Sequence, residues 1–261
     1  MSKPPVRERM NVLQSFKRSL KDYHQNAVVQ AEIAKTLIDH FLTTSQRENY
    51  SHVLEFGCAT GHLSEQLISR LKIDAFTAND LIEESQQYIA PKLNQLTSNW
   101  RFIAGAIEEI DLPENLDLVA SSSTVQWVFD TATLLEKLTS MLAPNGWLAL
   151  SSFTDNHFTE LQVMGSKAKA PRYTNVEDWP PLMPHNVAIK HIHTEEIKIH
   201  FPTVRAMLSH LRQTGVNGNA GQAWGRQKLL EFESVYEKQF KDDEGIFLTY
   251  APIYIIAQKQ S

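Results

Sequence analysis

Short apolar runs typical of buried strands alternate with helical patterns between residues 51 and 153. The strand-like runs cover 51–56, 73–80, 99–106, 116–123 and 146–153. Strands that alternate with helices at this period form a parallel sheet covered by helices on both faces. The pattern therefore predicts an α/β fold built on one mostly parallel sheet.

The first strand-like run ends in a turn of small residues. In "VLEFGCATGHLSEQL" (53–67), Gly57, Ala59 and Gly61 separate the strand from a helical pattern at about 61–71. Such a turn directs backbone N–H groups beyond the carboxyl edge of the sheet, where open α/β sheets bind ligands. The sequence therefore predicts a ligand site at this edge.

Two common nucleotide motifs do not fit this turn. The dinucleotide fingerprint G-x-G-x-x-G requires glycine or alanine where His62 stands. The phosphate-binding loop G-x-x-x-x-G-K-S/T requires one more residue between Gly57 and Gly61 and a lysine after them. The turn therefore disfavours nicotinamide, flavin and ATP ligands.

The spacing instead resembles the first motif of class I S-adenosylmethionine methyltransferases, an acidic residue followed by G-x-G-x-G. Glu55, Gly57, Ala59 and Gly61 match this motif, and Cys58 lies within it. The resemblance implies that S-adenosylmethionine is the cofactor, with Glu55 near the ammonium group of its methionine part. An ordinary strand-to-helix turn is the alternative explanation.

Two later turns would complete the cofactor site. Asp80 ends the second strand-like run, where its carboxylate can accept hydrogen bonds from both ribose hydroxyls; a helix N-cap is the alternative. After the third run, the family usually presents an acid and an apolar residue to the adenine, and here Ala106 and Ile107 stand. Without that acid, the adenine would depend on backbone groups and on packing between Leu81 and Ile107. Plain core packing is the alternative for these two apolar residues.

The segment "DLVASSSTVQWVFD" (117–130) resembles the S-N-x-x-x-Q-W segment of the malonyl-acyl carrier protein O-methyltransferases of biotin synthesis. Ser121, Gln126 and Trp127 match it, and Ser122 replaces the usual asparagine. Other segments follow the same family along nearly the whole chain, namely 16–30, 142–153, 158–161, 201–217 and 248–259. The resemblance implies a Rossmann-like, seven-stranded sheet with Ser121 and Ser122 on the cofactor side.

The same resemblance places side chains from the N-terminal helices at the site. Arg18 would lie on the cofactor side, while Tyr23 and Trp127 would close over the cofactor and shape a slot for an acyl chain. Gln126 would bind or position the substrate beside them. Core packing is the alternative for Trp127. Attachment of the N-terminal segment to the sheet is the alternative for Tyr23.

The reaction that this resemblance implies needs no catalytic acid or base. A malonyl carboxylate is ionised at neutral pH, so its attack on a sulfonium methyl group requires in-line geometry and exclusion of water. A cation would hold the carboxylate, and the candidates are Arg212, Arg205 and Arg172. Arg212 ranks first because its segment, 203–215, matches the family best. An exposed arginine on an amphipathic helix is the alternative.

Charge indicates what kind of partner to expect. The net charge of −5 does not favour nucleic-acid binding. Basic residues nevertheless gather in two places, and we expect them to dock an acidic acyl carrier protein that bears the malonyl group, with malonyl-coenzyme A as the other carrier. They are Lys17, Arg18, Lys21, Lys167 and Lys169. A solvated surface is the alternative.

The sequence predicts neither a membrane segment nor a metal site. It has no apolar run of about eighteen residues and no apolar signal segment at its N-terminus, so we expect a cytoplasmic protein without a membrane partner. Its single cysteine, Cys58, cannot form an internal disulfide or a two-cysteine metal motif. His191, His193 and Glu195 could be imagined as metal ligands, but an exposed polar strand face explains their spacing.

We expect a single domain with four parts: N-terminal helices (1–45), a cofactor-binding core (46–153), a lid insertion (154–195) and a C-terminal part that completes the sheet and the substrate side (196–261). Within the last two parts, 188–201 predicts one strand and 246–259 a terminal strand or pair of strands. The leading function is methyl transfer from S-adenosylmethionine to the free carboxylate of a malonyl thioester. The alternatives are methylation of another small carboxylate or hydroxyl compound and non-catalytic S-adenosylmethionine binding.

Overall fold

The computed structural model describes residues 6–97, 99–166, 170–215 and 225–261, and it contains a seven-stranded sheet in the order β3-β2-β1-β4-β5-β10-β6. The strands are β1 (Asn49–Phe56), β2 (Lys72–Asp80), β3 (Trp100–Ala104), β4 (Leu116–Ser121), β5 (Leu142–Phe153), β6 (Val187–Thr194) and β10 (Pro252–Lys259). Strands β1 to β5 are parallel, whereas β10 runs antiparallel to both β5 and β6. The expected seven-stranded, mostly parallel sheet is confirmed.

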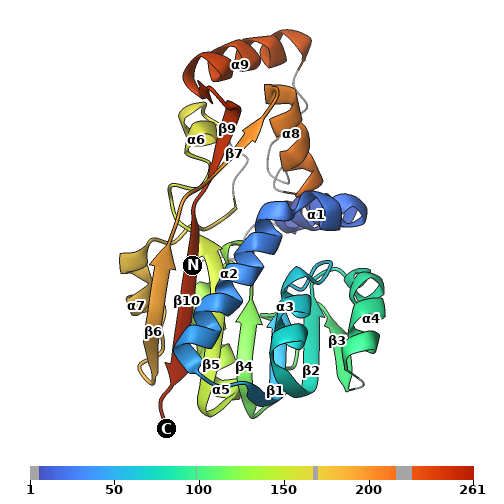
Figure 1. The fold of residues 1–261 in the computed structure, drawn as a ribbon, viewed down its shortest axis with the longest axis vertical. Helices are drawn as coiled ribbons and strands as arrows, with labels where there is room; N and C mark the ends of the chain where they lie inside the picture. Colours follow the sequence, from blue (N-terminus) through green and yellow to red (C-terminus); the bar gives the residue numbers. More distant parts are fainter. Residues whose placement is uncertain (1–5, 98, 167–169, 216–224) are drawn as a thin grey trace.

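Helices cover both faces of this sheet (Figure 1). Helices α2 (Val28–Ser45), α3 (His62–Arg70) and α4 (Ser85–Leu96) pack on one face, and α5 (Thr131–Met141) packs on the other. Successive side chains of a strand point to opposite faces. On β1, Val53 accordingly joins the apolar cluster of α2 and α3, while Leu54 joins the cluster of α5. The buried parallel strands thus separate two apolar cores.

A second, three-stranded sheet lies beyond the carboxyl ends of the parallel strands (Figure 1). Its order is β7-β9-β8, and its strands are β7 (Ile197–Phe201), β8 (Lys241–Asp242) and β9 (Gly245–Tyr250). Helices α8 (Val204–Gln213) and α9 (Arg226–Gln239) pack beside it, and α1 (Val6–Asn26) contacts α8. The edge at which the sequence predicts a ligand is therefore covered by α1 and by the second sheet with its helices, whereas the C-terminus lies at the other end of the main sheet (Figure 1).

The region expected to form a lid, 154–195, consists of a segment with short helices and a strand of the main sheet. Residues 154–186 contain α6 (Thr159–Val163), the 3-10 turn η2 (Val176–Asp178) and α7 (Trp179–Leu182). Strand β6, in contrast, pairs with β10 and forms one edge of the main sheet. The single strand expected over 188–201 is two strands, because the chain leaves the main sheet after Thr194 and enters the second sheet at Ile197. The expected terminal pair of strands is present as β9 and β10.

Candidate functional site

The small-residue turn after β1 requires its glycines. Gly57 and Gly61 have φ values of 69° and 92°, in the left-handed region that favours glycine. A Cβ atom at Gly57 would lie 2.1 Å from Oγ1 of Thr124, which follows β4. Ala59 also has a positive φ, 46°, which costs a residue with a Cβ atom about 1–2 kcal/mol. The turn therefore combines a strained backbone with a close approach of the next loop.

Asp80 joins this turn to the one after β2. Its Oδ2 accepts a hydrogen bond from the backbone N–H of Ala59, and its Oδ1 accepts one from that of Ile82, both at 2.8 Å. Burial raises the pKa of this carboxyl group, and these backbone bonds oppose the shift. Helix α4 begins five residues later with Glu84 as its N-cap, so Asp80 is not a helix cap. A carboxylate has about four lone-pair sites, which leaves acceptor capacity for a ligand.

Glu55, at the end of β1, is buried beside the turn. Its Oε2 accepts a hydrogen bond from the Ser64 hydroxyl at 2.5 Å. Burial raises the pKa of Glu55 to about 8, and the neighbouring Asp80 contributes in the same direction. The acid is therefore mostly protonated at neutral pH, and a cation placed beside it would favour the ionised form.

Glu55 and the turn line a pocket of about 280 Å³, which we call the cofactor-side pocket. Its lining residues are Tyr23, Gln30, Ala34, Glu55, Gly57, Cys58, Ala59, His62, Leu63 and Ser122. This wall is polar, because it contains a buried acid and the buried Nε2 of His62, which has no partner among the described residues. Its small residues let a ligand approach the backbone closely. The residues present therefore fit a ligand with a cationic group, as S-adenosylmethionine requires.

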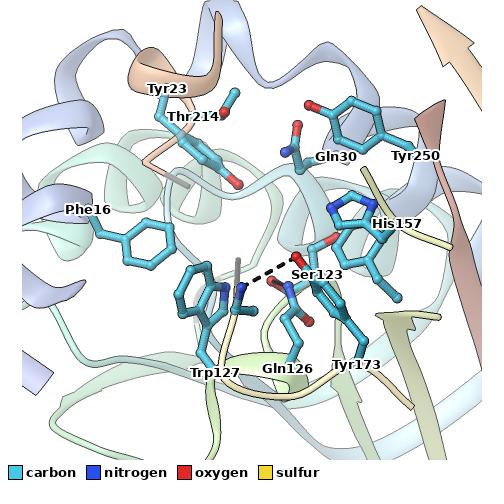
Figure 2. A pocket seen from close by; sticks show the side chains of 12 residues that line it. Phe16, Tyr23, Gln30, Ser123, Gln126, Trp127, His157, Tyr173, Thr214 and Tyr250 are labelled. Carbon is cyan, nitrogen blue, oxygen red and sulfur yellow. Dashed lines mark hydrogen bonds between the residues drawn. The ribbon is translucent and has the colours of Figure 1, made fainter. Parts of the chain in front are cut away.

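An adjoining pocket of about 370 Å³ lies towards the second sheet, and we call it the substrate-side pocket (Figure 2). Tyr23 and Gln30 line both pockets. Its remaining lining residues are Phe16, Ser123, Gln126, Trp127, Phe153, His157, Ala170, Tyr173, Thr214 and Tyr250. Two ligands can therefore meet between Tyr23 and Gln30.

Tyr23, Gln126 and Trp127 all line the substrate-side pocket. Gln126 is buried, and its Nε2 donates a hydrogen bond to the backbone oxygen of Ser123 at 2.7 Å. The ring of Trp127 meets the ring of Phe16 edge to face, with centroids 4.9 Å apart. The aromatic contact fastens α1 to the loop after β4 and closes one wall of the substrate-side pocket.

The side chains expected around the adenine differ in burial. Ile107 is buried in the apolar cluster of α5, so the alternative of core packing holds for it. Leu81 is 48% exposed, and the backbone oxygen of Ala106 accepts hydrogen bonds within a turn. The turns that carry these residues are neighbours, because the backbone N–H of Gly105 donates to the backbone oxygen of Asp80 at 2.9 Å, and packing of an adenine between Leu81 and Ile107 stays a prediction.

Two further residues expected on the cofactor side lie away from the pockets. The fully buried Ser121 donates from its hydroxyl to the backbone oxygen of Phe56 at 2.8 Å, which ties β4 to β1. Arg18 is exposed on α1, and its guanidinium donates to Gln14. Ser122, in contrast, lines the cofactor-side pocket.

The three candidate arginines do not line either pocket in the part of the chain that the structure describes. Arg205 is exposed and forms a two-bond ion pair with Glu233 of α9. Arg212 is exposed on α8. Arg172 lies nearest, because its backbone N–H donates to the backbone oxygen of Gln126 at 3.2 Å. The choice among these three arginines as the carboxylate holder stays a prediction, and Arg212 is not among the described residues that line the substrate-side pocket.

Sequence reasoning missed four residues that line the substrate-side pocket as possible carboxylate partners: Gln30, His157, Tyr173 and Tyr250. His157 follows the carboxyl end of β5, which is the edge where a ligand is expected, so that position was a usable signal. Tyr250 ends β9 of the second sheet. No local pattern predicts that this strand returns to the pocket.

The histidines near β6 form an aromatic cluster. His191 and His193 pack against His40 of α2, with ring centroids 4.6 and 5.1 Å away, and Glu195 accepts a hydrogen bond from Tyr254. Within the described residues, no group of three or more His, Cys, Asp or Glu side chains is arranged to hold a metal ion. None of the helices described is long and apolar enough to cross a membrane.

Solved structures share the fold at low sequence identity. The YcgJ protein of Bacillus subtilis superposes with a TM-score of 0.65 at 12% identity, over 87% of this chain and 99% of that one. The N-methyltransferase NodS of Bradyrhizobium japonicum, solved with S-adenosyl-L-homocysteine, gives a TM-score of 0.56 at 14% identity over 96% and 100% of the two chains. These similarities establish the Rossmann-like methyltransferase fold.

Sequence comparison identifies the family. A family model described as "Methyltransferase domain" matches residues 53–146. The malonyl-acyl carrier protein O-methyltransferase of Chlorobium phaeovibrioides is 31% identical over 98% of both chains. The enzyme of the same name from Acinetobacter baylyi is 33% identical over 96% of both chains. This chain therefore belongs to the malonyl-acyl carrier protein O-methyltransferase family.

Proposed function

We propose that the protein transfers a methyl group from S-adenosylmethionine to the free carboxylate of a malonyl group carried on acyl carrier protein. The observation that carries this proposal is the pair of adjoining pockets at the carboxyl edge of the sheet. One contains the motif turn and Glu55, and the other contains Gln126 and Trp127. Family membership supports the same activity.

Glu55, in the cofactor-side pocket, would meet the ammonium group. Asp80 is bonded to the backbone of the lining residue Ala59, and its remaining lone pairs would accept from the ribose hydroxyls. The exposed Leu81 beside Asp80 offers an apolar surface to the adenine. The left-handed turn at Gly57 and Ala59 would let the ligand approach the backbone closely.

When bound, S-adenosylmethionine supplies a sulfonium methyl group, whose carbon forms a bond to a carboxylate oxygen as its bond to sulfur breaks, giving a methyl ester and S-adenosylhomocysteine. No proton leaves the substrate, so the protein needs no general base. The side chains at the junction, Tyr23 and Gln30, would instead align the two ligands and exclude water.

A turnover assay tests this function against its alternatives. The purified protein is incubated with S-adenosylmethionine and malonyl-acyl carrier protein, malonyl-coenzyme A, or free malonate and succinate. We expect methyl ester from the two thioesters. Methylation of the free dicarboxylates alone would favour another small-molecule substrate, and cofactor binding without any product would favour a non-catalytic role.

Protonation of Glu55 should make cofactor binding pH-dependent. Its pKa of about 8 in the free protein would fall beside the ligand's ammonium group, so binding at pH 6.5–7 should release a proton. Affinity should therefore rise with pH in this range, by at most about tenfold per pH unit. Calorimetric titration in two buffers with different ionisation enthalpies measures the release.

Glu55→Gln is the matched control for that titration, because the amide cannot ionise but keeps an acceptor for Ser64. Its heats should agree in the two buffers. Equal heats for the wild-type protein would instead show that Glu55 does not meet the ammonium group.

Exposed basic residues on α1 should matter for the carrier protein. Lys17 pairs with Glu84, and Lys167 and Lys169 lie outside the described residues, which leaves Arg18 and Lys21 as the exposed pair to test. Replacing both with glutamate should raise the KM for malonyl-acyl carrier protein more than that for malonyl-coenzyme A. Steady-state kinetics on the two thioesters at low and high salt gives the comparison.

The control for this experiment is the pair Lys72→Glu and Lys190→Glu. Both lysines are exposed on the main sheet, and Lys72 begins β2 at the opposite edge from the pockets. An equal rise in KM for both variant pairs, or for both substrates, would contradict docking through α1.

A further inference from the structure

One buried imidazole in the substrate-side pocket has a fixed proton position. His157 is only 3% exposed, and its Nδ1 accepts a hydrogen bond from the backbone N–H of Ala251 at 3.3 Å. A neutral imidazole that accepts at one ring nitrogen carries its proton on the other. The Nε2 atom of His157 is therefore a hydrogen-bond donor.

The ring cannot turn away from this arrangement easily. It is stacked between Phe153 and Phe158, with ring centroids 3.8 and 3.7 Å away. Burial lowers the pKa of His157 well below its ordinary value, so the ring is neutral at physiological pH. Ala251 is the one hydrogen-bond partner of this ring in the described part of the chain, which leaves the Nε2–H group available to a ligand.

Two uncharged polar side chains lie next to His157 in the substrate-side pocket. Gln30 and Tyr250 lie beside the imidazole (Figure 2), and the His157 and Tyr250 rings are 5.1 Å apart between centroids. Gln30 is only 8% exposed, and its Oε1 has no partner within the described residues. Among the described residues that line this pocket none is a lysine or an arginine, so the donors that they offer to a carboxylate are neutral.

We propose that His157 recognises the free carboxylate of the malonyl group by donating its Nε2–H to one carboxylate oxygen. This inference rests on the proposed function, and it names the residue that selects the substrate. A single neutral donor leaves the second oxygen free to attack the methyl group, whereas a guanidinium commonly binds both oxygens of a carboxylate.

The same contact explains discrimination between thioesters. An acetyl group presents no carboxylate oxygen to the Nε2–H of His157, so this buried donor would stay unpaired. The methylated product presents only a neutral carbonyl oxygen, which is a weaker acceptor than a carboxylate. The pocket should therefore hold the malonyl group and release its methyl ester.

Two substitutions test this role. His157→Phe keeps an aromatic ring between Phe153 and Phe158 but deletes the donor, and His157→Gln restores an N–H near the position of Nε2. With malonyl-coenzyme A, kcat/KM should fall by about 10- to 100-fold in His157→Phe, the equivalent of one hydrogen bond to a charged group. His157→Gln should recover most of the loss, and S-adenosylhomocysteine affinity should stay near wild type in both.

His40→Phe is the control for these variants. His40 is a half-buried histidine in a ring cluster outside the pockets, so its replacement should leave kcat/KM unchanged.

Binding to the wild-type protein gives a test that needs no variant. Titrations with malonyl-coenzyme A and acetyl-coenzyme A, both in the presence of S-adenosylhomocysteine, should show at least tenfold tighter binding of the malonyl thioester. Equal affinities would overturn the inference, as would wild-type turnover in His157→Phe or an equal loss in His157→Phe and His157→Gln. If the wild-type protein methylates neither thioester, the proposed function fails, and this inference fails with it.

Discussion

Gly57→Ala is expected to lower the free energy of unfolding by about 2–5 kcal/mol and to prevent cofactor binding. Two costs add at this position. The new Cβ atom would lie 2.1 Å from Oγ1 and 2.4 Å from Cγ2 of Thr124, and the φ of 69° would be strained for any residue with a side chain. Denaturant unfolding and calorimetric titration with S-adenosylhomocysteine measure the two effects.

Gly165 provides a matched control, because it has the same φ of 69° and, apart from its chain neighbours, no described residue lies within 4 Å of a Cβ atom added there. Gly165→Ala should therefore show only the conformational cost, about 1–2 kcal/mol. In the double variant Gly57→Ala/Thr124→Gly the steric part of the loss should be recovered. A cost at Gly57 no larger than that at Gly165 would show that the loop of Thr124 moves aside freely.

The cofactor turn could be predicted because its signal is local. The strand, the small residues and the helix all lie within 53–67, and the backbone geometry at Gly57 and Gly61 is the one that small residues permit. The position of Asp80, at the end of the next strand, could be predicted equally well. Strand β2 pairs with β1 and so brings Asp80 beside the turn.

The substrate side could be predicted only in part, because it is assembled from distant segments. Gln126 and Trp127 lie in one recognisable segment, but Tyr250 reaches the pocket from the second sheet. The pattern of 188–201 could not reveal that second sheet, since two strands joined by a short turn have the same polar alternation as one long strand. What the sequence pattern lacks is the set of contacts between segments that lie far apart in the chain.

The roles of the candidate arginines also depend on contacts that a local sequence pattern does not reveal. Helix α8 forms where the sequence predicts it, yet a helical pattern does not show which partner a charged side chain finds. Arg205 is occupied by Glu233, which lies 28 residues later on α9. For Ile107, too, the residue type does not reveal the contact. An apolar side chain serves equally well to pack in the core, where Ile107 lies, and to pack against an adenine.

Asp80→Ala should weaken S-adenosylmethionine binding by about 2–3 kcal/mol through the lost ribose contacts, the size of two charge-assisted hydrogen bonds. The structure adds a second loss, because the carboxylate also holds the backbone N–H groups of Ala59 and Ile82. Leaving these donors unpaired in a buried turn costs about 1–3 kcal/mol of folding stability. Calorimetric titration and denaturant unfolding report the two losses separately.

A double-mutant cycle separates ribose binding from support of the turn. The wild-type protein and the Asp80→Asn variant, which keeps one acceptor oxygen, are each titrated with S-adenosylhomocysteine and with its 2′-deoxy analogue. If Asp80 accepts from the ribose, removal of the 2′-hydroxyl should cost the wild-type protein more affinity than it costs the variant. The same cost in both proteins would mean that Asp80 acts through Ala59 and Ile82 alone, and that the ribose is held by other groups of the cofactor-side pocket.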